Sequence, residues 1–156
     1  MENQHPPIYL YTDGSSRGNP GPGGWGVVLV CGNLRKELSG GEASTTNNRM
    51  ELTAVIEGLK AIKWKDATVH IWSDSSYVVN AIEKGWLAQW LANDFRNKNK
   101  KKKANEELWR EYVRCSEGMD LHFHWLKGHA GHPENERCDE LAFEEATKLI
   151  DNGFDT

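Results

Sequence analysis

The order of hydrophobic patterns along the chain constrains its fold more than any other feature of the sequence. Three strand-like apolar runs come first. The clearest amphipathic helix follows, with apolar residues at the spacing i, i+3, i+4 and i+7, namely Leu52, Val55, Ile56, Leu59 and Ile62. From there, helical and strand-like patterns alternate. This order predicts a mixed α/β sheet with helices packed against it.

The patterns also indicate where each element lies. Strands are expected over residues 8–11, 25–30, 35–40, 68–73 and 121–126, and helices are expected to begin near residues 48, 76, 86, 108 and 133. Thr12, Asp13 and Gly14 are typical of a turn, so we expect the first strand to end there. A glycine-rich loop over residues 15–24 would follow this strand, and residues 96–103 would form a solvated basic loop.

The composition favours one soluble domain. The chain has 156 residues, 38% of them hydrophobic, which is enough for a single domain with a core over residues 1–156. We expect a cytoplasmic protein without a membrane partner, because the sequence shows neither a run long enough to span a bilayer nor a secretory signal at its start. Three widely spaced cysteines, Cys31, Cys115 and Cys138, indicate reduced thiols and not a disulfide framework.

Charge is unevenly distributed along the chain. The formal net charge is −4, but residues 84–110 carry eight Lys and Arg against three Asp and Glu, a balance of +5 that leaves −9 for the rest. We expect a basic protrusion around residues 84–104, in which Trp86 and Trp90 precede Lys100, Lys101, Lys102 and Lys103. Basic residues with aromatic neighbours are typical of surfaces that bind nucleic-acid phosphates. The alternative is a solvated lysine run with the tryptophans in the core.

Two aspartates directly follow predicted strands. Asp13 comes after the first strand and Asp74 after the fourth, and functional groups gather at strand ends in α/β sheets. Each also has an ordinary structural explanation: an Asp-Gly turn for Asp13, and an N-cap of the next helix for Asp74. Considered separately, neither residue indicates a function.

Three further candidates are equally open to a structural explanation. Glu51 lies three residues after Asn48 and would complete an Asn-x-x-Glu helix cap. Asp139 lies beside the apolar stripe of the last helix, where most acids are solvated. His129 lies in a glycine-flanked loop, which suits a proton-handling group at neutral pH as well as a merely exposed side chain.

Two kinds of metal site deserve comparison on ligand chemistry. His129, His132 and Cys138 are close in sequence, but no second Cys or His pair at the usual spacing completes a tetrahedral zinc site. Four carboxylates instead suit a hard cation, because Mg²⁺ and Mn²⁺ prefer oxygen ligands. Pairs of such ions roughly 4 Å apart serve in-line phosphoryl displacement in other enzymes.

Four blocks of sequence resemble the bacterial-type (type 1) ribonuclease H family, along nearly the whole chain. They cover residues 11–24, with TDGS and RGNPGPGG; residues 45–52, TTNNRMEL; residues 73–78, SDSSYV; and residues 125–142, with KGHAGHPENERCDELA. One Asp-Gly pair is weak evidence, whereas four blocks in the order of the family are specific. A turn, a cap pair and a surface acid would have no reason to occur together in these contexts.

The resemblance implies a fold, an activity and a catalytic set. The fold is a ribonuclease H-like α/β fold, a five-stranded mixed sheet with the first three strands antiparallel, flanked by helices. The activity is endonucleolytic hydrolysis of the RNA strand of an RNA–DNA hybrid, leaving 5′-phosphate and 3′-hydroxyl ends. The metal-binding and catalytic carboxylates would be Asp13, Glu51, Asp74 and Asp139, holding Mg²⁺ or Mn²⁺, as two ions with substrate bound. His129 would assist proton transfer or product release.

The resemblance also implies the substrate contacts. Selectivity for RNA requires sensing of 2′-hydroxyl groups in a wide minor groove. The positions matching family residues that touch the hybrid are Asn19, Asn47, Asn48 and Ser76, with Thr46 near a DNA phosphate, and Trp86 with Lys100 to Lys103 resembling a basic protrusion that grips it. A well-known relative has Cys at the position of Ser16 and Gln at that of Ser76, so the details of those contacts are not carried over.

Two other functions stay open beside this one. A non-catalytic hybrid-binding module on the same fold would gain nothing from four negative charges clustered near phosphate. A transposase- or resolvase-type DNA nuclease is disfavoured because we expect no additional DNA-recognition domain. Fold alone does not separate these functions, and the motif contexts favour the ribonuclease. We further expect a monomer, with a disordered tail over residues 151–156.

Overall fold

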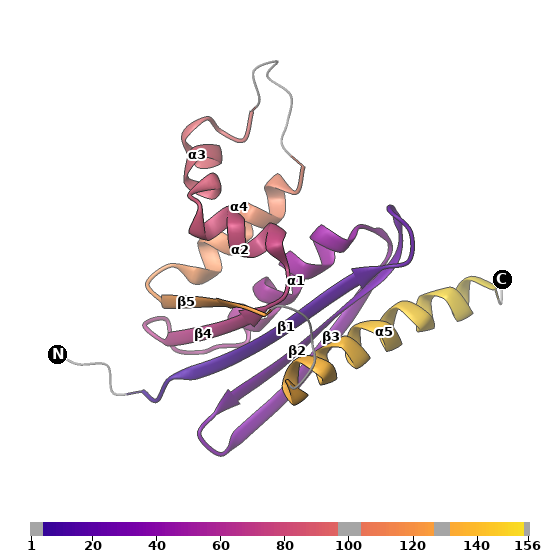
Figure 1. The fold of residues 1–156 in the computed structure, drawn as a ribbon, viewed down its shortest axis with the longest axis horizontal. Coiled ribbons are helices and arrows are strands. Elements are labelled where there is room, and N and C mark those ends of the chain that lie inside the picture. The colour runs from indigo at the N-terminus through magenta and orange to yellow at the C-terminus, as the bar shows by residue number, and fades with distance from the viewer. Residues whose placement is uncertain (1–4, 97–103, 127–131, 155–156) are drawn as a thin grey trace.

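The protein is built around one five-stranded sheet (Figure 1). The computed structural model describes residues 5–96, 104–126 and 132–154. The strands are β1 (Ile8–Ser16), β2 (Gly21–Cys31), β3 (Leu34–Thr45), β4 (Thr68–Ser73) and β5 (Asp120–Trp125), in the spatial order β3-β2-β1-β4-β5. The first three strands pair antiparallel, and β4 is parallel to both β1 and β5. The predicted mixed sheet with three leading antiparallel strands is therefore confirmed.

Helices cover both faces of the sheet. Those in the described part of the chain are α1 (Asn47–Lys60), α2 (Ser76–Glu83), α3 (Trp86–Ala92), α4 (Glu106–Ser116) and α5 (Pro133–Phe154). Gly58 of α1 packs on Leu10 of β1, whereas Gly26 of β2 faces α5 on the opposite side of the sheet. A Cβ at Gly26 would lie 2.3 Å from the carbonyl oxygen of Cys138, so the close approach of α5 requires glycine there.

The apolar stripe of α1 supplies much of the core, as its periodicity predicts. Leu52, Val55, Ile56 and Leu59 are all buried, in one cluster with the inward side chains of β1, β2 and β4. Each fully buried aliphatic side chain contributes roughly 1.5–3 kcal/mol to folding. The helix is held at its start by Thr46, whose side chain accepts a hydrogen bond of 3.2 Å from the Arg49 amide. This packing fixes the first turn of α1 against the sheet.

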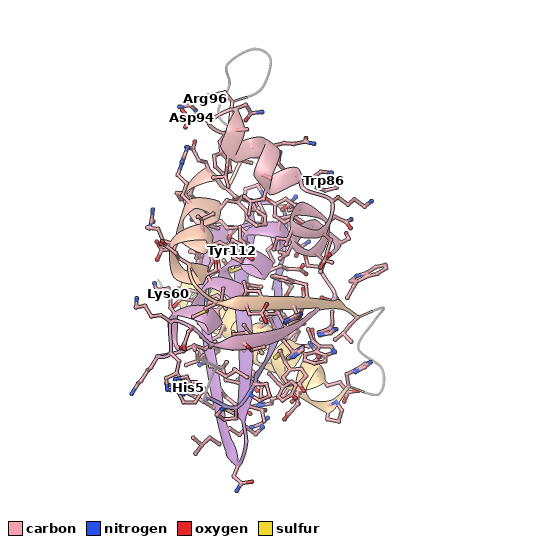
Figure 2. All side chains as sticks on the ribbon, turned by 90° about the vertical axis from the view of Figure 1, so that its left-hand side faces the viewer. His5, Lys60, Trp86, Asp94, Arg96 and Tyr112 are labelled. Atoms are coloured by element: carbon pink, nitrogen blue, oxygen red, sulfur yellow. The ribbon has the colours of Figure 1, made fainter. Side chains whose placement is uncertain are left out.

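A second body of helices, α2, α3 and α4, rises from the β4–β5 side of the sheet (Figure 1). Its interior holds Phe95 and Trp109, both fully buried, and the Trp109 indole donates a 2.8 Å hydrogen bond to the Tyr77 hydroxyl. Trp90 packs against this core, as expected if the two tryptophans are core residues. Trp86 does not fit that alternative, because it is 38% exposed. Trp86, Asp94 and Arg96 lie on the part of this body that projects away from the sheet (Figure 2).

The first two strands are longer than the sequence pattern predicted. We expected a turn at Asp13 and Gly14, but both lie inside β1, paired with Gly26 and Trp25 of β2. The glycine-rich segment expected as a loop forms the start of β2 from Gly21 onward. Gly18, with φ of +102°, lies in the short connection between the two strands, whereas Gly23 and Gly24 leave room for neighbouring elements. Periodicity within one segment cannot reveal such contacts.

Three further expectations concern a membrane span, the cysteines and the C-terminal tail. None of the helices that the structure describes is long and apolar enough to cross a membrane. Cys31, Cys115 and Cys138 are free thiols, as predicted. The last helix continues to Phe154 and so enters the segment 151–156, for which the sequence suggested disorder.

Candidate active site

Three carboxylates from distant parts of the chain meet at one end of the sheet. Asp13 lies in β1, Glu51 in the second turn of α1, and Asp74 directly after β4. One ligand oxygen from each lies within 4.8 Å of the others. Asp13 is buried and the other two are half-buried. The structure thus brings together three of the four acids that the sequence singled out.

Close backbone packing between β1 and α1 places Asp13 beside Glu51. A Cβ at Gly14 would lie 2.4 Å from the carbonyl carbon of Met50, so a larger residue would push the helix away. The Gly14 amide also donates a 2.9 Å hydrogen bond to Asp13 Oδ1. The Asp-Gly pair therefore lies within a strand, where Gly14 allows α1 to pack closely, and the turn predicted for it is wrong.

The helix-cap explanations for Glu51 and Asp74 are also wrong. The N-cap of α1 is Thr46 and not Asn48, so Glu51 is not the partner in an Asn-x-x-Glu cap. The N-cap of α2 is Ser75 and not Asp74, and its hydroxyl accepts a 3.1 Å hydrogen bond from the Val78 amide. Neighbouring Thr and Ser side chains fill both cap positions, and the two carboxylates lie beside Asp13 instead.

Asp139 approaches the same group from α5. Its side chain is exposed and hydrogen-bonded to that of Asp13, on the opposite side of the sheet from α1. Asn135, one turn earlier in α5, is buried and directs its amide toward the Thr12 carbonyl oxygen at 3.5 Å. The last helix is thereby anchored next to the end of β1, so that Asp139 adds a fourth acid at the rim.

Burial and mutual repulsion make this cluster unfavourable while it is fully ionised. Burial, followed by the charges of Asp74, Glu51 and Asp139, raises the pKa of Asp13 to about 9. Burial also raises the pKa of Glu51 to about 7, although a hydrogen bond from Ser75 lowers it in part and Asp74 adds to the rise. The cluster therefore favours either bound protons or a bound cation, and its oxygen-only donor set fits a hard divalent cation.

Some of the predicted substrate contacts lie close in sequence to members of this cluster. Thr46, Asn47 and Asn48 begin α1, one turn before Glu51, and exposed Ser76 begins α2 just after Asp74. Asn47 is held in place because its Oδ1 accepts a 2.7 Å hydrogen bond from the Ser16 amide at the end of β1.

The remaining predicted contacts lie farther along the chain. Asn19 is exposed in the β1–β2 connection, and Trp86 begins α3, with Lys84 Nζ 5.7 Å from its ring centroid. Lys100, Lys101, Lys102 and Lys103, like His129, lie outside the described residues.

One neighbour of the cluster was not predicted. Trp125, the last residue of β5, is 56% exposed and its indole nitrogen donates a 3.4 Å hydrogen bond to the Asp74 carbonyl oxygen. A tryptophan at the end of a strand is compatible with the core, so the local pattern does not indicate an exposed position. Its contact with Asp74 becomes evident only from the parallel pairing of β4 with β5.

Comparison with known sequences identifies the family. The family model for RNase H matches residues 5–147. A ribonuclease H from Desulforamulus reducens is 54% identical over 135 residues, which span 86% of this chain and 84% of that protein. A ribonuclease H from Sulfurovum sp. is 54% identical over 142 residues, spanning 91% of this chain and 92% of the relative.

Solved structures agree with the sequence relatives. LC9-RNase H1, described as a type 1 RNase H with the type 2 active-site motif, superimposes with a TM-score of 0.84 at 31% identity, over 96% of this chain and 76% of its own. LC11-RNase H1, solved in complex with an RNA/DNA hybrid, gives a TM-score of 0.67 at 27% identity, over 92% of this chain and 99% of its own. With the fold, the acid cluster and the sequence relatives in agreement, this chain belongs to the ribonuclease H family.

Proposed function

We propose that this protein is an endonuclease that hydrolyses the RNA strand of RNA–DNA hybrids and leaves 5′-phosphate and 3′-hydroxyl ends. The observation that carries the proposal is the convergence of Asp13, Glu51 and Asp74, whose ligand oxygens lie within 4.8 Å of one another. The hybrid bound by LC11-RNase H1 supports the substrate class, because that protein shares this fold over 92% of the present chain. We place the enzyme in the cytoplasm as a monomer.

The carboxylates would hold two Mg²⁺ ions, or Mn²⁺ in their place. Bound there, such ions supply an activated water and stabilise the charge that develops on the leaving 3′ oxygen. Asp13 is central to this arrangement, since it lies against Glu51, Asp74 and Asp139 and its ionised form is the most disfavoured without a cation. Asp139, exposed at the rim, is the acid best placed to face both solvent and substrate.

The chain's own residues would position the scissile phosphate and move protons. Burial of Asp13 excludes water from the inner side of the cluster, while half-buried Glu51 and Asp74 leave a side open to the substrate. We keep the assignment of His129 to proton transfer or product release as part of the proposal. Thr46, Asn47 and Ser76, at the starts of two helices that flank the cluster, are suited to contact sugar and phosphate oxygens.

Cleavage of a strand-labelled hybrid tests the activity. The hybrid should lose its RNA strand with Mg²⁺ or Mn²⁺ and stay intact with chelator, and single-stranded RNA, duplex RNA and duplex DNA should be spared. Analysis of the new ends should show 5′-phosphate and 3′-hydroxyl. A hybrid that is bound but left intact with every metal would replace the proposal with a binding module, and cleavage of duplex DNA would replace it with a DNA nuclease.

The basic protrusion is tested separately by charge neutralisation. Replacing Lys100, Lys101, Lys102 and Lys103 with Gln should raise KM more than it lowers kcat, because phosphate binding supplies affinity and carries little selectivity. The slope of log binding constant against log salt should shrink by roughly 0.7–0.9 for each phosphate that the variant no longer neutralises. Replacement of Lys63 and Lys65 with Gln is the matched control. An unchanged salt slope would remove the lysine run from the interface.

A further inference from the structure

Trp125 presents an exposed indole beside the carboxylate cluster of Asp13, Glu51 and Asp74. It is the last residue of β5, and the parallel register of β4 and β5 pairs it with Ser73. Asp74 follows Ser73 directly, and the indole nitrogen of Trp125 donates a 3.4 Å hydrogen bond to the Asp74 carbonyl oxygen. The residue is nevertheless 56% exposed. A large apolar ring therefore contacts the backbone of a candidate catalytic residue and still faces solvent.

The ring lies on the face of the sheet that also carries predicted substrate contacts. Side chains alternate between the two faces of a strand, so Trp125 shares its face with Phe123. Phe123 packs against the core that α1, α2 and α4 form on the sheet. Asn47 and Ser76 begin α1 and α2. Trp86 of the protrusion lies on the side of the molecule at which β5 ends (Figure 2).

A purely structural role does not account for an exposed tryptophan at this position. Its hydrogen bond to Asp74 is longer than the usual range of roughly 2.7–3.2 Å and is exposed to water, so it contributes little to stability. The backbone already joins the ends of the two strands, because the Leu126 amide donates a 2.8 Å hydrogen bond to the Ser73 carbonyl oxygen. The fold therefore needs neither the indole nitrogen nor the exposed part of the ring.

The indole of Trp125 is available to a ligand, unlike the aromatic rings on the other face of the sheet. There, Trp72 and His124 stack on each other with ring centroids 4.3 Å apart, and Tyr11 stacks on Trp72 at 5.3 Å. Those rings cover one another. Trp125 has no ring partner in the described part of the chain and makes its hydrogen bond through the edge of the indole. Free aromatic faces of this kind are what nucleic-acid-binding proteins offer to nucleotides.

An uncharged contact suits a position beside this cluster. Burial and the charges of neighbouring acids raise the pKa of Asp13, so the cluster repels a phosphate wherever its charge is not compensated. An indole supplies apolar contact area without adding to that charge. Tryptophan also loses little conformational entropy on binding, because it has only two rotatable side-chain bonds. It can therefore add affinity for a nucleic-acid strand that the acids themselves oppose.

We propose that Trp125 is a substrate-binding residue, whose indole packs on a sugar of the cleaved RNA strand next to the scissile phosphate. This inference rests on the proposed function, in which Asp74 helps to hold the metal ions at that phosphate. In a base-paired hybrid the bases cover one another's faces, so the strand offers mainly the C–H groups of its sugars to a neighbouring ring. The contact holds the strand in place, while the carboxylate cluster performs the chemistry.

Binding of a fluorescently labelled hybrid to the full chain in chelator, followed by anisotropy, tests the contact without cleavage. Trp125→Leu should weaken binding on the order of tenfold, the scale of losing one well-placed aromatic contact. The slope of log binding constant against log salt should stay unchanged, because no phosphate charge is involved. Trp125→Phe keeps a ring but lacks the N–H, and should bind within about threefold of the wild type. Trp64→Leu is the matched control, since Trp64 precedes β4 and Trp125 lies beside its other end.

Steady-state cleavage in Mg²⁺ separates substrate binding from positioning of Asp74. Trp125→Leu should raise KM with little change in kcat, as expected for a contact made equally in the ground state and the transition state. Circular dichroism and Tm would verify that each variant is folded. Unchanged hybrid binding by Trp125→Leu, a changed salt slope, or equal losses of kcat in Trp125→Leu and Trp125→Phe would overturn this inference alone, provided that the wild type cleaves the hybrid. A wild type that binds no hybrid would overturn the proposed function itself.

Discussion

One sheet carries two clusters of titratable side chains that differ in how they are enclosed. The carboxylate cluster, Asp13, Glu51 and Asp74, lies where α1 and α5 close on β1 from both faces. The histidine cluster of His70, His122 and His124 lies on β4 and β5, whereas α5 packs mainly on β1, β2 and β3. Burial leaves like charges without water, so the first cluster favours a bound cation, whereas in the second cluster burial, followed by His122 and His124, lowers the pKa of His70.

This difference shows that helix coverage, and not the sheet alone, sets the chemistry of each cluster. Strand register pairs His70 with His122 and Trp72 with His124. Asp74, two residues after Trp72, comes directly after the end of β4. The other acids of the carboxylate site, apart from Asp13, come from helices: Glu51 from α1 and Asp139 from α5. Substitutions in the two clusters should therefore have separable effects on catalysis and stability.

The largest expected effect is on catalysis by Asp13→Asn. Because Asp13 contacts the other acids of the cluster, its replacement should lower kcat on hybrid by about 10²–10³ or more, the scale on which one electrostatic stabiliser contributes. Asp120→Asn, which removes a carboxylate beside the histidine cluster, should cleave at close to the wild-type rate in Mg²⁺. Initial rates on a labelled hybrid measure both. Equal decreases in the two variants would mean that the clusters do not act separately.

The next effect is on the pH dependence of stability in chelator. The pKa of Asp13 is about 9 in the folded protein and near 3.8 in the unfolded chain, so the folded state binds the proton more tightly. The free energy of unfolding should therefore fall as pH rises from about 4 to about 9. Asp13→Asn carries no such proton and should exceed the wild type in stability at about pH 8 by about 1–3 kcal/mol.

Urea denaturation across this pH range measures that difference, with Asp120→Asn as the exposed control. Mg²⁺ should remove most of the advantage of Asp13→Asn, because the cation compensates the charge that the wild type must hold. Parallel stability profiles for the wild type and Asp13→Asn would show that burial does not penalise this carboxylate.

Glu51→Gln should also be more stable than the wild type at high pH in chelator, but by less than Asp13→Asn. The pKa of Glu51 rises from 4.5 to about 7, less than that of Asp13, and a hydrogen bond from Ser75 already offsets part of the penalty. Its contribution to the fall in stability should be confined to about pH 4.5 to 7 and should amount to about 1 kcal/mol. Denaturation of Glu51→Gln beside Glu57→Gln, an acid near the other end of α1, separates this effect from a general change in helix charge.

The sequence predicted most of the fold and much of the candidate site, for an identifiable reason. Periodicity located α1 because its apolar stripe contacts the core along its whole length, and strand-like runs located all five strands. The four acids could be selected only as a set, since the local patterns around Asp13, Glu51 and Asp74 are also those of turns and caps. The roles proposed for the carboxylates rest on their joint geometry.

What the sequence did not predict depends on contacts between distant segments. The extension of β1 through Asp13 depends on pairing with Gly26, and the approach of α1 depends on the missing side chain of Gly14. Trp125 meets Asp74 only because β5 lies parallel to β4. The histidine cluster was missed for the same reason, since His70 is separated in sequence from His122 and His124 and no spacing rule joins them.

The smallest expected effect is on the pH dependence of stability through His70, and its direction with pH is opposite to that of Asp13. Burial, then His122 and His124, lower the pKa of His70 below its usual 6.5, so the folded state binds the proton less tightly than the unfolded chain does. This group should therefore cost stability as pH falls through the unfolded value, whereas the carboxylate cluster costs stability as pH rises. Titration of the His70 ring protons by NMR measures the shift, and His122→Gln should move the pKa back toward 6.5 more than His124→Gln does. Because burial is the largest cause, neither variant should restore the ordinary value. A wild-type His70 that titrates at or above 6.5 would show that the open face of β4 and β5 is solvated like any surface, and would remove the electrostatic contrast between the two clusters.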